Sequence, residues 1–138
     1  MTRAEFITKI IGAEWVIRGV SFDACDCWGL VLLYYKHVLN IELPKIEGYK
    51  NAYDVADCWQ REELKPHWLK VDSANENDLV FTCYTIACRP CHVGVYIGNG
   101  KVLHTDGGFE RGGSVRVNSA SALERLHGKI TYHRYIGV

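Results

Sequence analysis

The pattern of apolar and polar positions differs between the two halves of the chain, and the first half favours helices. Residues 2–11 carry apolar side chains at helical spacing, which predicts a short amphipathic helix. Residues 12–25 show no regular pattern, so we expect loops there. Residues 27–39 are strongly apolar and predict a mostly buried helix. A further helix is expected across residues 53–64, stopped by Pro66.

The second half of the chain favours strands. Its apolar stretches are rich in β-branched and aromatic residues and are bounded by Gly, Asn or Asp. The expected strands cover residues 78–82, 92–97, 101–105, 114–117 and 130–135. A short helix is expected at 120–126, between the last two strands. Helices followed by strands predict an α+β fold with an antiparallel sheet, because a parallel sheet would need alternating strands and helices.

Length, composition and charge narrow the class of protein. The 138 residues fit a single domain spanning 1–138, and 48% hydrophobic against 23% charged residues is a normal globular balance. Sixteen basic residues balance sixteen acidic ones, so we expect no nucleic-acid binding, which needs a concentrated positive surface. No apolar run approaches the roughly 18 residues that cross a bilayer, so no membrane partner is expected.

The N-terminus and the cysteines bear on the compartment. The first eleven residues alternate charged and apolar side chains and lack the apolar centre of a secretion signal. We therefore expect a protein that stays in the cytoplasm or is packaged into a particle without secretion. In such a reduced chain, cysteines indicate metal ligands, a nucleophile or small buried residues. The six cysteines are at positions 25, 27, 58, 83, 88 and 91.

Two histidines flank a predicted hairpin. His92 and His104 lie twelve residues apart around Gly98-Asn-Gly100. A three-residue loop would pair Ile97 with Lys101 and would place both histidines on one face, within reach of each other. A two-residue loop would put them on opposite faces unless a bulge corrected the register. A paired function for the histidines therefore predicts an odd-numbered loop.

Cys27 opens the apolar helix and is the candidate nucleophile. A thiol at a helix N-terminus feels the positive end of the helix dipole and unpaired N–H groups, and both favour the thiolate. We expect Asp26 to turn back and cap the helix. The predicted site has Cys27 as nucleophile, His92 beside its sulfur as base, and His104 orienting His92. Taken alone, a cysteine at a helix start is more often only a buried packing residue.

Four separate segments of the sequence carry motifs that form one pattern. They are Gly12–Gly19, Asp26–Val31, His92–Gly98 and Val102–Thr105. In order, spacing and flanking apolar residues, they resemble the NlpC/p60 family of cell-wall cysteine peptidases. The likeness runs from about residue 12 to 135 and is weakest across 45–75. The wording around the cysteine is most similar to the branch found in phage tail-assembly and tail-tip proteins.

The resemblance implies a papain-like fold, with N-terminal helices packed on a C-terminal antiparallel sheet. It implies hydrolysis of a peptide bond in the peptidoglycan stem, of the type joining the γ-carboxyl of D-glutamate to a diamino acid. Cys27 would be the nucleophile, His92 the general base and His104 the third polar residue, with no metal or cofactor. The implied partners are the stem peptide and, from the phage branch, other tail proteins in a virion.

Two positions depart from the family pattern. Members usually carry Tyr twelve positions before the nucleophile, where its hydroxyl helps to hold the oxyanion, and this chain has Trp15. An indole N–H can also donate a hydrogen bond, so Trp15 is either an oxyanion residue or a packed aromatic side chain. Arg18 replaces the first glycine of the usual Gly-Gly pair. The backbone N–H of Cys27 is the other candidate for the oxyanion hole.

Three other functions remain open at this point. Cys83, Cys88 and Cys91 have the spacing of the first three ligands of a plant-type iron–sulfur cluster, but no fourth cysteine follows them. Cys58, Cys25 or His92 would have to supply the fourth ligand, and a zinc site could use Cys88, Cys91 and two other residues. A structural tail subunit could keep the fold without turnover. Acyl transfer to an amine or lipid would pass through the same thioester at Cys27 as hydrolysis does.

Overall fold

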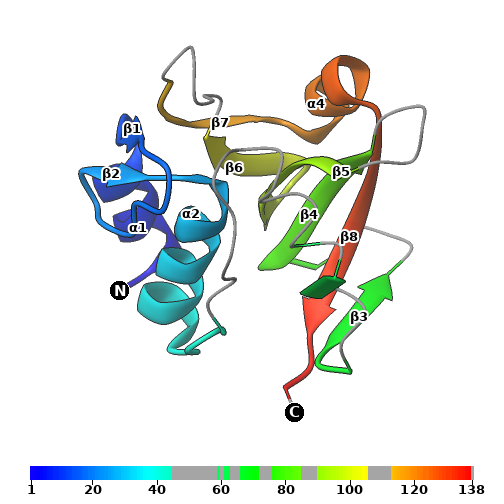
Figure 1. The fold of residues 1–138 in the computed structure, drawn as a ribbon, viewed down its shortest axis with the longest axis horizontal. Helices are drawn as coiled ribbons and strands as arrows, with labels where there is room; N and C mark the ends of the chain where they lie inside the picture. Colours follow the sequence, from blue (N-terminus) through cyan, green and yellow to red (C-terminus); the bar gives the residue numbers. More distant parts are fainter. Residues whose placement is uncertain are drawn as a thin grey trace.

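The computed structural model describes residues 1–44, 59, 61–62, 66–71, 76–84, 90–105 and 113–137, in which a sheet lies between two groups of helices (Figure 1). Helix α1 spans Arg3–Ile10 and helix α2 spans Cys27–Tyr34. Helix α4 spans Ala120–His127. Helices α1 and α2 lie on one side of the sheet and α4 lies on the other.

Among the described residues, six strands form one antiparallel sheet in the order β3-β8-β4-β5-β6-β7. Their bounds are Trp68–Val71 for β3, Leu79–Tyr84 for β4, Pro90–Gly98 for β5, Lys101–Thr105 for β6, Val115–Ser119 for β7 and Lys129–Tyr135 for β8. Two short strands, β1 (Glu14–Trp15) and β2 (Ala24–Cys25), pair in parallel just before α2 in the chain.

The two faces of the sheet pack against different helices. On one face, Val93 and Val95 of β5 join an apolar cluster with Trp28 of α2. On the other face, Tyr96 of β5 joins a cluster with Leu123 of α4. Successive side chains of a strand point to opposite faces. The even-numbered side chains of β5 between positions 92 and 96 therefore face α4, and the odd-numbered ones face α2.

The prediction of an α+β fold is confirmed. The five expected strands appear as β4 to β8, and the helices expected at 2–11 and 120–126 appear as α1 and α4. The helix expected at 27–39 is α-helical only as far as Tyr34 and continues as a π-helical segment, Tyr35–Leu39. It ends at Asn40, which takes a left-handed conformation with φ 57°.

Three features differ from the sequence-based expectation or fall outside its test. Strands β1 and β2 lie where loops were expected, and they contain only two residues each. Strand β3 was not expected, because four residues at the edge of a sheet carry too little alternation to be recognised. The helix expected at 53–64 lies mostly outside the described residues, although Trp59, Arg61 and Glu62 are helical.

Helix α2 is short, apolar and almost completely covered. Leu32 is the one residue of its eight that is not buried. A helix that is apolar all round is stable in a folded domain only when other elements cover it. Helix α1, the sheet and the loop before α2 do so here. No helix in the described part of the chain has the length and apolar character needed to cross a membrane.

The first turn of α2 lies directly against the loop that precedes it. A Cβ atom added to Gly29 would overlap the backbone carbonyl oxygen of Gly19. A Cβ atom on Gly19 would in turn lie 2.8 Å from the carbonyl oxygen of Ala24. Both obstacles are backbone atoms and cannot rotate away. Glycine at these two positions therefore sets how closely the start of α2 approaches residues 19–24.

Gly29→Ala is expected to lower the free energy of unfolding by about 2 kcal/mol, because the added methyl group forces the backbones apart. This loss should appear even though alanine is about 1 kcal/mol better than glycine as a helix former. Urea denaturation followed by circular dichroism measures the change. Arg125→Ala, at an exposed position of α4, is the control and should change stability by less than about 0.5 kcal/mol. A stabilised Gly29→Ala protein would contradict this account.

Candidate active site

The hairpin that carries the two histidines has a two-residue turn, so the expected three-residue loop is wrong. Gly98 pairs with Lys101, which leaves Asn99 and Gly100 as the turn. Their φ angles of 53° and 70° are the positive values that a type I′ turn needs. Ile97 has no partner on β6 and forms a bulge, so it does not pair with Lys101. This extra residue restores the register that places both histidines on one face.

The two histidine rings are hydrogen bonded to each other. His92 Nε2 lies 2.8 Å from His104 Nδ1, and the ring planes are nearly perpendicular at 82°. His104 Nε2 lies 2.7 Å from Oδ1 of Asn118 on β7. Three neighbouring strands thus contribute one polar side chain each to a continuous chain of hydrogen bonds. The predicted contact between His92 and His104 is confirmed.

Asn118 and His127 were not identified from the sequence. Asn118 lies one residue beyond the strand expected at 114–117, so the sequence did not predict that its side chain shares a face of the sheet with the histidines. His127 is the last residue of α4, and its ring stacks on His92 with a centroid distance of 4.8 Å. The ring of Phe81 lies 5.9 Å from His92. These neighbours come from three different elements, so no regular spacing along the sequence identifies them as neighbours of His92 and His104.

The surroundings of His92 keep its imidazole neutral. Burial is the largest influence, and the rings of His104 and His127 add to it. Together they hold the pKa of His92 well below its ordinary value of 6.5. A neutral imidazole can accept a proton, which a general base must do.

Asp26 caps α2 as expected and also holds the loop before it. Its Oδ1 accepts a hydrogen bond from the N–H of Gly29 at 2.7 Å, and its Oδ2 accepts one from the N–H of Arg18 at 2.6 Å. Arg18 has φ 63°, a left-handed conformation that glycine adopts most easily. The departure from Gly-Gly therefore falls at a position where the backbone itself favours glycine.

Opposing influences act on the pKa of the Cys27 thiol at the helix start. The N–H groups of Cys27 and Trp28 lower its pKa, as expected for a helix N-terminus. Burial and the carboxylate of Asp26 raise the pKa by more, so the net shift is upward. Removal from water therefore outweighs the helix dipole in its effect on the thiol pKa. The role of Cys27 as nucleophile stays a prediction.

Cys27 and His92 are held by different elements of the fold. Cys27 begins α2, which packs against the sheet beside Val93. The ring of His92, on β5, stacks on that of His127 in α4. The placement of the Cys27 sulfur beside His92 stays a prediction.

Trp15 lies on a short strand whose partner strand directly precedes α2. It pairs with Cys25 across β1 and β2, two residues before Cys27, and its side chain is buried. Its backbone N–H donates to the carbonyl oxygen of Gly113 at 2.9 Å. The burial of the Trp15 side chain agrees with a packed aromatic residue, and its role in an oxyanion hole stays a prediction.

The metal alternative falls largely outside the described residues. Cys88 and the side chain of Cys91 are not described, whereas Cys83 is buried and lies opposite His92 in the strand pairing. In the part of the chain that is described, no group of three or more His, Cys, Asp or Glu side chains is placed to hold a metal ion.

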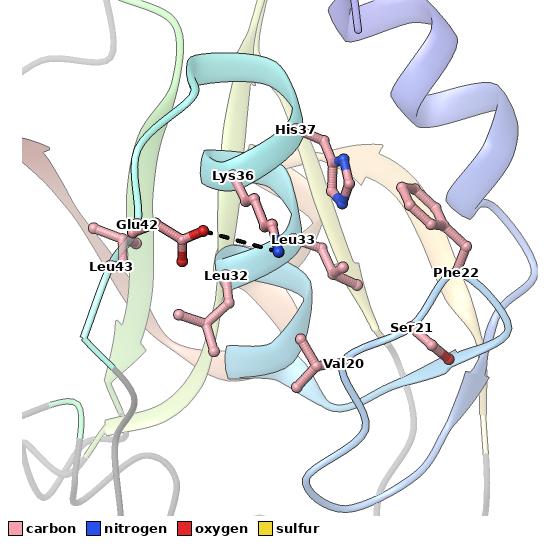
Figure 2. A pocket seen from close by; sticks show the side chains of 9 residues that line it. All are labelled: Val20, Ser21, Phe22, Leu32, Leu33, Lys36, His37, Glu42 and Leu43. Atoms are coloured by element: carbon pink, nitrogen blue, oxygen red, sulfur yellow. Dashed lines mark ion pairs between the residues drawn. The ribbon is translucent and has the colours of Figure 1, made fainter.

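A cavity of about 460 Å³ lies beside α2 and the segment that follows it (Figure 2). Val20 and Phe22 from the preceding loop and Leu32 from the helix form part of its apolar wall. An ion pair between Lys36 and Glu42, 3.8 Å apart, lies at its edge. None of Cys27, His92 and His104 lines this cavity, so it is separate from the candidate catalytic residues.

Asp26→Asn is expected to make Cys27 react faster with iodoacetamide at pH 8, by about threefold to tenfold, because it removes the nearest negative charge. Asparagine still caps a helix, so α2 should persist. Peptide mass spectrometry with fragmentation separates Cys27 from Cys25. Asp23→Asn makes the same charge change at an exposed position and should leave the rate unaltered. Equal rates in both variants would show that burial alone suppresses the thiolate.

Comparisons with known proteins agree with this fold and these motifs. The model of the NlpC/P60 family matches residues 12–135. Murein DD-endopeptidase MepH from Escherichia coli (strain K12) is 31% identical over 96 residues, which are 70% of this chain and 31% of that protein. The chain thus spans about a third of the length of this curated relative.

Solved structures of two related domains share the fold. The NlpC/p60 domain of the peptidoglycan hydrolase SagA has a TM-score of 0.56 at 20% identity, covering 94% of this chain and 93% of that one. NlpC2 from Trichomonas vaginalis has a TM-score of 0.61 at 19% identity, covering 96% of this chain and 44% of that one. Since the family model extends over nearly the whole sequence, this chain belongs to the NlpC/P60 family.

Proposed function

We propose that this chain is a cysteine peptidase that hydrolyses peptide bonds in the peptidoglycan stem. The observation that carries the proposal is the hydrogen-bonded pair of His92 and His104, at the family's positions in a chain that belongs to it. The names of two similar proteins, a murein endopeptidase and a peptidoglycan hydrolase, support the substrate class. The bond is of the type that joins the γ-carboxyl of D-glutamate to a diamino acid.

Cys27, His92 and His104 take separate roles in the reaction. His92 accepts the thiol proton at Nδ1 as the Cys27 sulfur attacks the scissile carbonyl carbon. The backbone N–H of Cys27, with the indole of Trp15, stabilises the oxyanion that forms. The imidazolium then protonates the leaving amine, and a thioester remains. Water attacks the thioester with His92 again as base, which releases the carboxylate and restores the thiol.

The proton moves during the attack and not before it. The pKa of the Cys27 thiol is raised and that of His92 is lowered, so the resting pair is neutral. An enzyme with a preformed thiolate–imidazolium pair would need both shifts in the opposite direction. The reaction also requires the sulfur and the imidazole to come within hydrogen-bond reach.

A structural subunit without turnover is the second candidate. The raised pKa of the Cys27 thiol favours it, and so does Arg18 in a conformation better suited to glycine. A place in a phage tail, with other tail proteins as partners, is compatible with both the peptidase and the structural subunit. It rests on the resemblance of the motif wording, as does the location in the host cytoplasm or the virion.

Cys27→Ala is expected to abolish cleavage of purified muropeptides, with a loss of at least about 10³-fold, because no other group can form the thioester. New amines are measured by chromatography after fluorescent labelling. Cys25→Ala is the matched control, since Cys25 is a buried free thiol two residues away. Turnover that survives in Cys27→Ala would remove Cys27 as nucleophile. No product from wild-type protein that folds normally would favour the structural subunit.

The acid limb of the pH profile of kcat/KM is expected well below pH 6.5. Burial lowers the pKa of His92, so the free enzyme keeps its base as the pH falls and loses it only when the pH passes that lowered pKa. The measurement is kcat/KM on a labelled stem peptide between pH 4 and pH 8 at constant ionic strength. A limb at or above pH 6.5 would mean that another group, or a more exposed His92, controls the rate.

A further inference from the structure

The hydrogen-bond chain of His92, His104 and Asn118 has a direction. A neutral imidazole carries one N–H, which donates, and one bare nitrogen, which accepts. In a chain of such rings every hydrogen bond is therefore donated in the same direction. The amide oxygen of Asn118 faces His104 Nε2 at 2.7 Å, and an oxygen can only accept. His104 Nε2 therefore carries the hydrogen, and its Nδ1 is bare. That bare nitrogen lies 2.8 Å from His92 Nε2, which must be the donor.

The last step of the chain defines the reactive atom. Because Nε2 of His92 carries its hydrogen, Nδ1 of His92 holds the lone pair. No hydrogen bond to that nitrogen is made anywhere in the chain as described, so it is available to accept a proton. The oxygen of Asn118, two rings away, thus determines which nitrogen of His92 can act as a base.

We propose that Asn118 is a positioning residue that sets the tautomers of His104 and His92 and leaves Nδ1 of His92 as the proton acceptor. The use of that acceptor in peptide hydrolysis rests on the proposed function, whereas the tautomers do not. An amide turned the other way would present its NH₂ group to His104. Each ring would then carry its hydrogen on the other nitrogen, and every hydrogen bond in the chain would be donated in the opposite direction. His92 would then carry its hydrogen on Nδ1 and could not accept the thiol proton there.

The position of Asn118 suits such a role and makes it open to test. It lies on β7, an edge strand of the described sheet, and its side chain is exposed, whereas His104 is 3% exposed. The amide therefore covers the solvent side of a buried ring. Substitutions at exposed strand positions usually change stability by less than about 0.5 kcal/mol. Loss of the fold is therefore not the expected outcome of changing Asn118.

Nitrogen-15 spectra of histidine-labelled protein distinguish the two tautomers of each ring. In wild-type protein at pH 7.5, both His92 and His104 are expected to carry hydrogen on Nε2. Asn118→Asp places a carboxylate beside His104, favours its doubly protonated form and makes it a donor to His92. His92 should then switch to the Nδ1–H tautomer. Asn118→Leu removes the acceptor, so His104 should become a mixture of tautomers.

Turnover of a labelled stem peptide should follow the tautomers. Both variants are expected to lower kcat by about tenfold or more with little change in KM, as loss of an orienting hydrogen bond does in other sites. Lys101→Leu makes a similar polar-to-apolar change at an exposed position of the neighbouring strand β6 and should change neither spectrum nor turnover.

The outcomes separate this inference from the proposed function. A wild-type His92 that carries hydrogen on Nδ1 would overturn the inference without any activity measurement, and so would unchanged tautomers in Asn118→Asp. The expected tautomers in a protein that cleaves no stem peptide would uphold the role of Asn118 and reject the peptidase. If Asn118→Leu failed to fold, the wild-type spectrum and Asn118→Asp would still decide the question.

Discussion

The bulge at Ile97 is the constraint on which the candidate site depends. A two-residue turn at Asn99-Gly100 would by itself set β5 and β6 one residue out of register and would separate the histidines. The unpaired residue returns the strands to the register in which His92 meets His104. Bulges often occur beside functional sites because they redirect side chains without lengthening the loop. Here one residue determines whether a polar chain exists across three strands.

Asp26 links the stability of the helix start to the reactivity of the thiol. One carboxylate oxygen accepts from the N–H of Gly29 in the first turn of the helix, which would otherwise lack a partner within the helix, and the other accepts from the N–H of Arg18 in the preceding loop. The same negative charge raises the pKa of the Cys27 thiol next to it. The carboxylate that caps the helix and holds the backbone of Arg18 in its left-handed conformation therefore also disfavours the thiolate form of Cys27. The chain gains a well-defined helix start and loses the activation that a helix dipole would supply.

The candidate residues belong to different elements of the fold and share one property, burial. Cys27 begins α2 and joins the apolar cluster that contains Val93, whereas the ring of His92 lies beside Phe81 and stacks on His127. Burial raises the pKa of the Cys27 thiol and lowers the pKa of His92, so it favours the neutral form of both groups.

The local features of this protein could be predicted from its residues, and the relations between distant elements could not. Apolar spacing predicted α1, the α2 helix start and five strands, and the cap by Asp26 followed from its place before Cys27. These depend on interactions within a few residues, which repeat in every folded protein. Asn118, the stacking of His127 and the raised pKa of Cys27 depend on which segments meet and how much water they exclude. That information exists only once β5, β6, β7 and α4 are packed together, because burial and contacts across strands are properties of the assembled layers.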